Sequence, residues 1–226
     1  LGLTYHHAIL MSYAMPESNL VTLEQYIIEE ELSRPGATDA FGTLLHSITS
    51  AAKTISREVN RAGVVDVVGS TGTTNVQGEL VQKLDVYSQD VIFAAVNHTG
   101  TISCMVSEEH EEILSIPKEF PRGDYVLICD PLDGSSNIDI NAPLGSIFSI
   151  HRLSVSSSSD GDGDYLRPGF EQVAGGYILY GASTILVYTC GDGVDLFTLT
   201  PDNDEFLLTK SHVTIPARGK IYSVNE

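Results

Sequence analysis

The chain has 226 residues, of which 42% are hydrophobic and 19% are charged, and 30 acidic against 12 basic residues give a formal net charge of −18. This composition is typical of a globular protein with one large domain or two small ones. The acidic balance argues against binding to nucleic acid or to an anionic membrane surface, since both attract basic proteins. A phosphorylated substrate stays open, because a bound metal ion can reverse the local charge.

The cysteines and the chain start bear on the compartment. Cys104, Cys129 and Cys190 lie in apolar runs without CxxC spacing, which favours reduced structural thiols in a cytoplasmic protein. No apolar run is long enough to span a membrane. The start of the chain lacks the regions of a signal peptide, and we expect residues 1–21 to form a disordered or loosely attached extension.

Helical patterns come first along the chain. Thr22 and Gln25 form a capping-box pattern that predicts the start of a first helix. Apolar residues at i, i+3, i+4 and i+7 predict a second helix over 41–59, and a third is predicted over 85–97. Between the last two, the Gly- and Thr-rich stretch 68–79 predicts a mobile loop.

Strand patterns follow the helices. The predicted strands cover 101–107, 112–116, 125–129, 145–152, 173–181, 184–189, 194–200 and 205–209. The turn residues PDND predict a hairpin between the last two strands. Helices first and strands later predict an α+β or layered α/β fold, with helices packed on a large mixed sheet.

Two acidic pairs follow predicted strands. Glu108 and Glu109 come after TISCMVS, and Asp130 and Asp133 come after YVLIC. Either pair alone is more simply a solvated strand edge or a turn, but both together favour a site at the ends of neighbouring strands. Like charges this close require a cation, and hard oxygen ligands suit Mg²⁺ or Mn²⁺ better than Zn²⁺.

The residues around Asp133 add further binding groups. Leu132 offers a backbone carbonyl between the two aspartates, and the N–H groups of Gly134, Ser135 and Ser136 are suited to an anion. The segment therefore predicts a metal ion and a phosphate bound side by side.

Two more acids precede the strands. Glu79 lies in the predicted loop and Asp85 at the start of the third helix. Asp85 either only complements the helix dipole or, with Glu79, acts as a base or metal ligand that orients an attacking water.

Several motifs resemble class I fructose-1,6-bisphosphatase. They are NVQGELVQKLDV at 75–86, VSEE at 106–109, DPLDGSSNID at 130–139, AGGYILYGASTILVYT at 174–189 and GKIYSVNE at 219–226. The resemblance runs in order from Thr22 to Glu226. Inositol monophosphatases typically carry DPIDGT instead, so LDGSSNID favours a sugar bisphosphatase.

The resemblance implies hydrolysis of the 1-phosphate of fructose 1,6-bisphosphate, a step of gluconeogenesis, with two to three Mg²⁺ ions per site or with Mn²⁺. It implies as metal ligands Glu108, Glu109, Asp130, the carbonyl of Leu132, and Asp133. It implies as catalytic acids Asp85, Glu109 and Glu79, the last standing where the family often has Asp. It implies as substrate-binding residues Asp133, Gly134, Ser135, Ser136 and Asn225.

The family continues well beyond YSVNE. The resemblance thus implies a regulatory and metal-binding phosphatase domain over 22–211 and only the start of a truncated substrate domain over 212–226, with the C-terminal α/β part missing. We therefore expect an incomplete enzyme. The alternatives are another sugar bisphosphatase, such as sedoheptulose-1,7-bisphosphatase, and a truncated regulatory or assembly form without turnover.

Two regulatory expectations also come from the resemblance. The family is usually tetrameric, which implies a homo-oligomer. Asp124 stands where the family's AMP site has a phosphate-binding lysine, which argues against AMP control.

Overall fold

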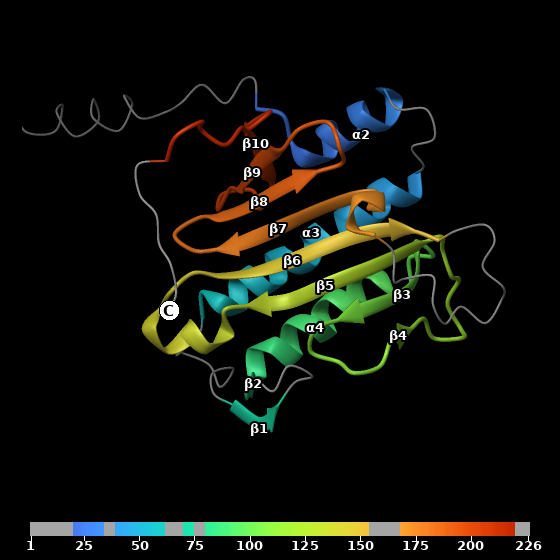
Figure 1. Cartoon of the computed structure of the whole chain (residues 1–226), viewed down its shortest axis with the longest axis vertical. Coiled ribbons are helices and arrows are strands. Elements are labelled where there is room, and N and C mark those ends of the chain that lie inside the picture. Colours follow the sequence, from blue (N-terminus) through green and yellow to red (C-terminus); the bar gives the residue numbers. More distant parts are fainter. Residues whose placement is uncertain (1–19, 34–38, 62–69, 75–79, 154–167, 220–226) are drawn as a thin grey trace, which may run out of the picture.

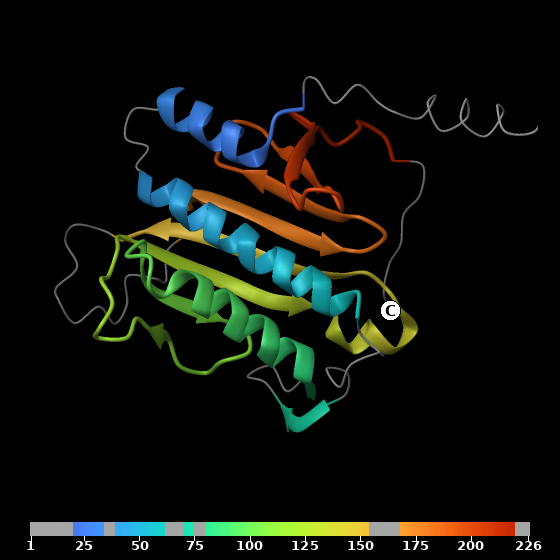
Figure 2. The same cartoon turned by 180° about the vertical axis from the view of Figure 1, so that it is seen from behind.

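The structure, a computed structural model, describes residues 20–33, 39–61, 70–74, 80–153 and 168–219. Nearly all of the predicted N-terminal extension and part of the predicted loop over 68–79 lie outside these ranges. The described α-helices lie on one side of a large sheet, behind it in Figure 1 and in front of it in Figure 2. None of the described helices is long and apolar enough to cross a membrane.

The helices are α2 (Leu23–Ser33), α3 (Asp39–Val59) and α4 (Lys83–Val96). The predicted capping box is confirmed at the start of α2, where the N–H of Thr22 donates to Gln25 Oε1 and the N–H of Gln25 donates to Thr22 Oγ1, both over 3.1 Å. These bonds satisfy donors that have no partner within the helix. Tyr26 then donates a hydrogen bond to Asp195 over 2.6 Å, which ties α2 to the sheet.

Helix α3 has one buried face, as its apolar spacing predicts. Leu44, Leu45, Ile48, Ala52 and Ile55 on this face are all less than 4% exposed and pack against the sheet. Helix α4 begins two residues before its predicted start. Its buried face contains Leu84 and Ile92 but also Asp85, so one carboxylate lies among core residues.

The main sheet has eight strands in the order β10-β9-β8-β7-β6-β5-β3-β4. They are β3 (Ile102–Ser107), β4 (Leu114–Ser115), β5 (Tyr125–Asp133), β6 (Leu144–Arg152), β7 (Ala174–Tyr180), β8 (Thr184–Thr189), β9 (Asp195–Leu199) and β10 (Phe206–Lys210). All neighbours are antiparallel except β3 and β5, which are parallel. The predicted layered fold with a mixed sheet is confirmed.

Two local expectations require correction. The predicted strand over 125–129 continues to Asp133, so the acidic segment is part of β5 and does not follow it. The described part of the predicted mobile loop is the strand β1 (Ser70–Thr74), which pairs with β2 (Leu80–Gln82). Its threonines are β-branched and favour strand conformation once a partner is present.

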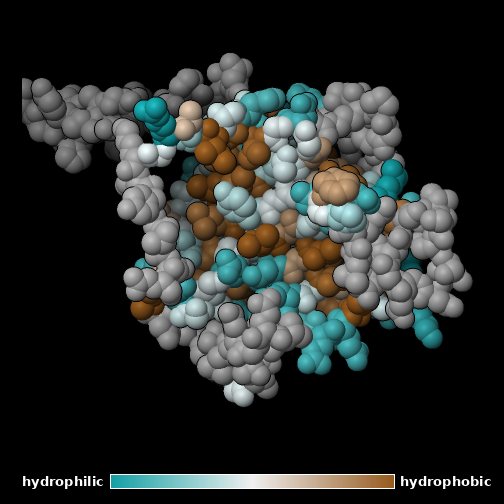
Figure 3. Space-filling model, viewed as in Figure 1, coloured by the Kyte–Doolittle hydropathy of each residue, from teal (hydrophilic) through white to brown (hydrophobic). Residues whose placement is uncertain are grey.

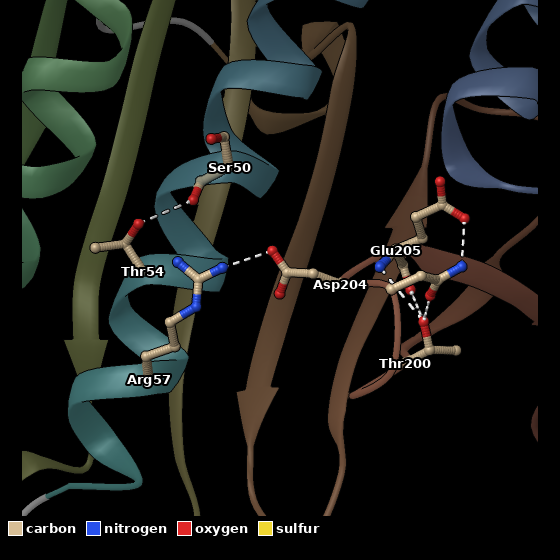
Figure 4. A network of polar contacts seen from close by, with 7 residues as sticks. Ser50, Thr54, Arg57, Thr200, Asp204 and Glu205 are labelled. Carbon is tan, nitrogen blue, oxygen red and sulfur yellow. Dashed lines mark hydrogen bonds and ion pairs between the residues drawn. The ribbon is translucent and has the colours of Figure 1, made fainter.

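The predicted hairpin between β9 and β10 is confirmed. The N–H of Thr200 donates to the carbonyl of Glu205 over 2.8 Å, and the N–H of Asp204 donates to the carbonyl of Thr200 over 3.1 Å. The carboxylate of Asp204 pairs with Arg57 of α3 at 2.6 Å (Figure 4). Both side chains of this ion pair are well exposed, at 60% for Arg57 and 45% for Asp204, so the pair contributes little to stability.

The opposite face of the sheet is open among the described residues. Ile147, Tyr177 and Leu179 are 38% to 47% exposed there, and Figure 3 shows apolar side chains gathered over the strands. A shallow groove of about 480 Å³ runs over β5 to β8 and reaches Asp130. The open face therefore leads to the acidic segment of β5.

Candidate active site

The acidic end of β5 is a β-bulge. Asp130 pairs with Ile147 and Asp133 with Gly145, so three residue steps on β5 face two on β6. Pro131 has no N–H to donate to the sheet, which suits it to such a position. The bulge interrupts the alternation of buried and exposed side chains along the strand, because Pro131 and Leu132 are both buried.

A local hydrogen bond orients the first aspartate of the bulge. The N–H of Leu132 donates to Asp130 Oδ1 over 3.1 Å, and the side chain of Leu132 is 2% exposed and anchored in the core. The carboxylate of Asp130 is therefore held toward its own backbone.

The parallel pairing of β3 and β5 brings the two acidic pairs to one edge of the sheet. Ser107 pairs with Cys129, and the N–H of Glu108 donates to the carbonyl of Cys129 over 3.1 Å. The N–H of Glu109 donates to Ser107 Oγ over 3.3 Å, which shapes the turn after β3. Glu108 thus lies beside the residue that precedes Asp130, as expected for neighbouring parallel strands.

Asp85 joins the cluster from the first turn of α4. It is 1% exposed, and its Oδ2 accepts a hydrogen bond from Ser135 Oγ over 3.0 Å. Ser135 opens the short 3₁₀-helix η2 (Ser135–Ile140), which follows Gly134 at φ 82°. Glycine adopts this left-handed conformation without strain, so the chain can turn sharply from Asp133 into η2.

The carboxylates of this cluster repel one another. The pKa of Asp130 is raised from 3.8 to about 7, first by burial and then by Glu108 and Asp133, with a smaller contribution from Asp85. The N–H of Leu132 offsets part of the rise. Excess negative charge around Asp130 is the environment that a divalent cation relieves.

The donor types at the end of β5 fit a hard cation. Carboxylate and carbonyl oxygens are the ligands that Mg²⁺ takes, and it usually keeps water or substrate oxygens in its shell. Within the described ranges, no group of three or more His, Cys, Asp or Glu side chains is arranged to hold a metal ion by itself. The protein groups therefore suit an ion that substrate or water completes.

The predicted site residues differ in how far the structure places them together. It joins Asp85 to Ser135 by a hydrogen bond. It also places Glu108 and Asp133 near enough to Asp130 to raise the pKa of that carboxyl. Glu109 lies in the turn after β3 and Ser136 is exposed in η2. Glu79 and Asn225 lie outside the described residues.

One buried contact to the bulge was not predicted. Ser146 Oγ donates to the carbonyl of Pro131 over 2.7 Å from the neighbouring strand β6. The available signal was a serine that alternates with Leu144 and Phe148 on the inward-facing side of the strand, where a hydroxyl needs a partner.

Comparisons with known proteins agree with this geometry. Residues 21–211 match the family model described as fructose-1-6-bisphosphatase, N-terminal domain. The class 1 fructose-1,6-bisphosphatase of Nitratidesulfovibrio vulgaris is 51% identical over 94% of this chain and 62% of its own. That of Lawsonia intracellularis is 50% identical over 92% of this chain and 63% of its own.

A solved structure shows the same fold. The holo form of Leishmania major fructose-1,6-bisphosphatase superposes with a TM-score of 0.84 at 37% identity, over 92% of this chain and 64% of that one. The chain thus spans less than two thirds of the length of these relatives. The matches in family model, sequence and fold place the chain in the class 1 fructose-1,6-bisphosphatase family.

Proposed function

We propose that this chain carries the metal- and phosphate-binding part of a phosphatase that hydrolyses the 1-phosphate of fructose 1,6-bisphosphate. The observation that carries the proposal is the arrangement at the end of β5, where the register with β3 places Glu108 beside Cys129 and where Ser135 donates a hydrogen bond to the buried Asp85. Carboxylates next to a glycine turn at the start of a short helix suit metal-assisted phosphoryl chemistry. The membership of the family supports the same reaction.

The metal-holding groups come from two strands. Glu108, Asp130, Asp133 and the carbonyl of Leu132 would hold Mg²⁺ or Mn²⁺, and Glu109 would hold a further ion with Glu79, for two to three ions in all. When bound, such ions polarise the phosphoryl group and lower the pKa of bound water. The raised pKa of Asp130 supports this role, since a bound cation would offset the negative charges of Glu108 and Asp133 that help to raise it.

The other residues orient substrate and water. The N–H groups of Gly134, Ser135 and Ser136 would donate to the phosphate oxygens at the start of η2. Asp85 would accept a hydrogen bond from the attacking water and take its proton. The hydrogen bond from Ser135 supports this assignment, because it fixes the orientation of Asp85.

The sugar-binding part of the substrate site remains a proposal as well. We assign Asn225 to it, with residues 22–211 as the regulatory and metal-binding phosphatase domain and 212–226 as the start of the substrate domain. The alternatives are hydrolysis of another ketose bisphosphate, such as sedoheptulose 1,7-bisphosphate, and a truncated regulatory or assembly form without turnover. A homo-oligomer, tetrameric as is usual in the family, is proposed on the resemblance, and a cytoplasmic location on the cysteine pattern.

Asp124 supports a weak response to AMP. Its side chain is exposed, and a carboxylate there repels a phosphate group. Inhibition at low micromolar AMP, which corresponds to about −8 kcal/mol of binding free energy, would contradict this.

The direct test is phosphate release with Mg²⁺. It should be measured on this chain and on a chimera that adds the part of the Nitratidesulfovibrio vulgaris relative beyond the match. We expect the chimera to hydrolyse fructose 1,6-bisphosphate and both Asp130→Asn and Glu108→Gln to abolish this. Glu119→Gln, an exposed acid, is the matched control. Unchanged rates in the two site variants would refute the metal assignment.

A further inference from the structure

The carbonyl of Pro131 is the buried backbone group at the centre of the bulge. A bulge disrupts the regular hydrogen bonds between strands, and a buried carbonyl still needs a donor. The hydroxyl of Ser146 supplies it over 2.7 Å. Ser146 is 3% exposed, so water does not compete for this bond.

A second buried hydroxyl supports the first. The hydroxyls of Tyr180 and Ser146 lie 2.8 Å apart, and Tyr180 is 3% exposed. Because Ser146 has one proton and gives it to Pro131, Tyr180 is the donor in this second bond. Burial raises the pKa of Tyr180 well above its usual range, which keeps that proton in place.

The two bonds run sideways through three neighbouring strands. Tyr180 is on β7, Ser146 on β6 and Pro131 on β5. Pro131 stands between Asp130 and Leu132, two of the groups assigned to the metal. The Pro131 carbonyl and the Leu132 N–H belong to one planar peptide unit, so a bond that holds the carbonyl also holds the N–H that donates to Asp130 Oδ1.

We propose that Ser146 and Tyr180 are positioning residues for the metal-binding bulge, and that their hydroxyls hold the Pro131 carbonyl so that Asp130 and Leu132 face the metal. The role rests on the proposed function, because the two groups are metal ligands only under it. Partners of this kind behind metal ligands typically change metal affinity about 10–100-fold when removed.

The chain offers a matched control. Ser56 of α3 and Thr184 of β8 form another buried pair of hydroxyls, 2.6 Å apart, which links α3 to the sheet. Ser56 is 4% exposed, close to the 3% of Ser146. Ser56→Ala therefore removes a comparable buried hydroxyl bond without touching the bulge.

The test measures Mn²⁺ binding to the whole chain by electron paramagnetic resonance of the free ion. Ser146→Ala should weaken binding roughly tenfold or more, and Tyr180→Phe should weaken it less. Ser146→Thr keeps a hydroxyl and should bind Mn²⁺ as the unmodified chain does. Ser56→Ala should leave it within about threefold. Equal losses in Ser146→Ala and Ser56→Ala would overturn the positioning role.

A second measurement does not depend on the metal. Hydrogen exchange of the Leu132 N–H, which is bonded to Asp130, should accelerate in Ser146→Ala and Tyr180→Phe but not in Ser56→Ala. Unchanged exchange in Tyr180→Phe and Ser146→Ala would overturn the role. If Ser146→Ala does not fold, Tyr180→Phe alone decides by the same two measurements.

Asp130→Asn separates the two proposals. Loss of Mn²⁺ binding in Asp130→Asn, together with unaffected binding and exchange in Ser146→Ala, would overturn the positioning role alone. Unchanged binding in Asp130→Asn would instead overturn the metal assignment, and the exchange of Leu132 would still decide whether the hydroxyls hold the bulge.

Discussion

Ser135 Oγ donates a hydrogen bond to Asp85 Oδ2 over 3.0 Å and so joins the start of η2, just after β5, to the first turn of α4. The two residues are 50 positions apart in the chain. Asp85 is 1% exposed, and a buried carboxylate is costly unless hydrogen bonds or cations compensate it. The contact therefore both stabilises Asp85 and sets its orientation in the site.

Asp85→Asn should lower phosphate release by about 10²-fold or more, because an amide cannot accept the proton of the attacking water. Ser135→Ala should cost less, since the carboxylate remains but loses one orienting bond. The rates are measured with Mg²⁺ in the chimera described above. Asp90→Asn, an exposed acid on the same helix, serves as the control, and equal effects of Asp85→Asn and Asp90→Asn would exclude the proposed role of Asp85.

The stability of the metal-free chain should fall as pH rises from about 4 to about 7. The folded chain keeps the proton of Asp130 up to a pKa of about 7, while the ordinary value is 3.8. The folded state therefore binds more protons than the unfolded state in this window, and the free energy of unfolding decreases with pH. Water partly screens Asp130, so we expect about 1–2 kcal/mol.

Urea unfolding in EDTA at pH 5 and pH 8 checks this dependence. Asp130→Asn should flatten it and raise stability at pH 8, whereas Glu119→Gln should leave it unchanged. Saturating Mg²⁺ should also raise stability at pH 8 by binding the folded state alone. A free energy of unfolding that rises from pH 5 to pH 8 in the metal-free chain, but not in Asp130→Asn, would contradict the predicted direction.

Tyr26→Phe should destabilise the chain by about 1–3 kcal/mol, because it deprives the buried carboxylate of Asp195 of a donor. Asp195 is 3% exposed and would keep the N–H of His212 at 2.8 Å. Thermal unfolding measures the change. Arg57→Ala breaks an exposed ion pair and should cost less than about 1 kcal/mol; a larger cost there than in Tyr26→Phe would reverse the expected ranking.

Gly176→Ala should destabilise the chain by about 1–3 kcal/mol or more through overpacking. A Cβ at this position of β7 would lie 2.5 Å from the carbonyl oxygen of Val187 and 2.8 Å from the ring of Phe148. Gly169→Ala meets no atom within 4 Å and should be nearly neutral. Urea unfolding of both variants compares them, and similar stabilities would show that β7 and β8 adjust to the extra methyl group.

The elements of this fold could be predicted because their patterns are local. The apolar spacing over 41–59 specifies α3, and its buried face repeats that spacing. The capping box at Thr22 needs only residues three apart. The predicted end of β5 was wrong, because a proline such as Pro131 normally ends a regular strand. The hydroxyl that bonds the Pro131 carbonyl comes from the neighbouring strand β6, which a local pattern does not reveal.

The sequence by itself determined the order of the helices and of the strands of the main sheet, the acids that follow or end strands, and the resemblance to the family. Tertiary structure alone decided which of these acids meet. The parallel register of β3 and β5 places Glu108 beside Cys129, and the packing of α4 on β5 brings Asp85 to Ser135. Register and packing depend on contacts between distant segments, which no local pattern encodes.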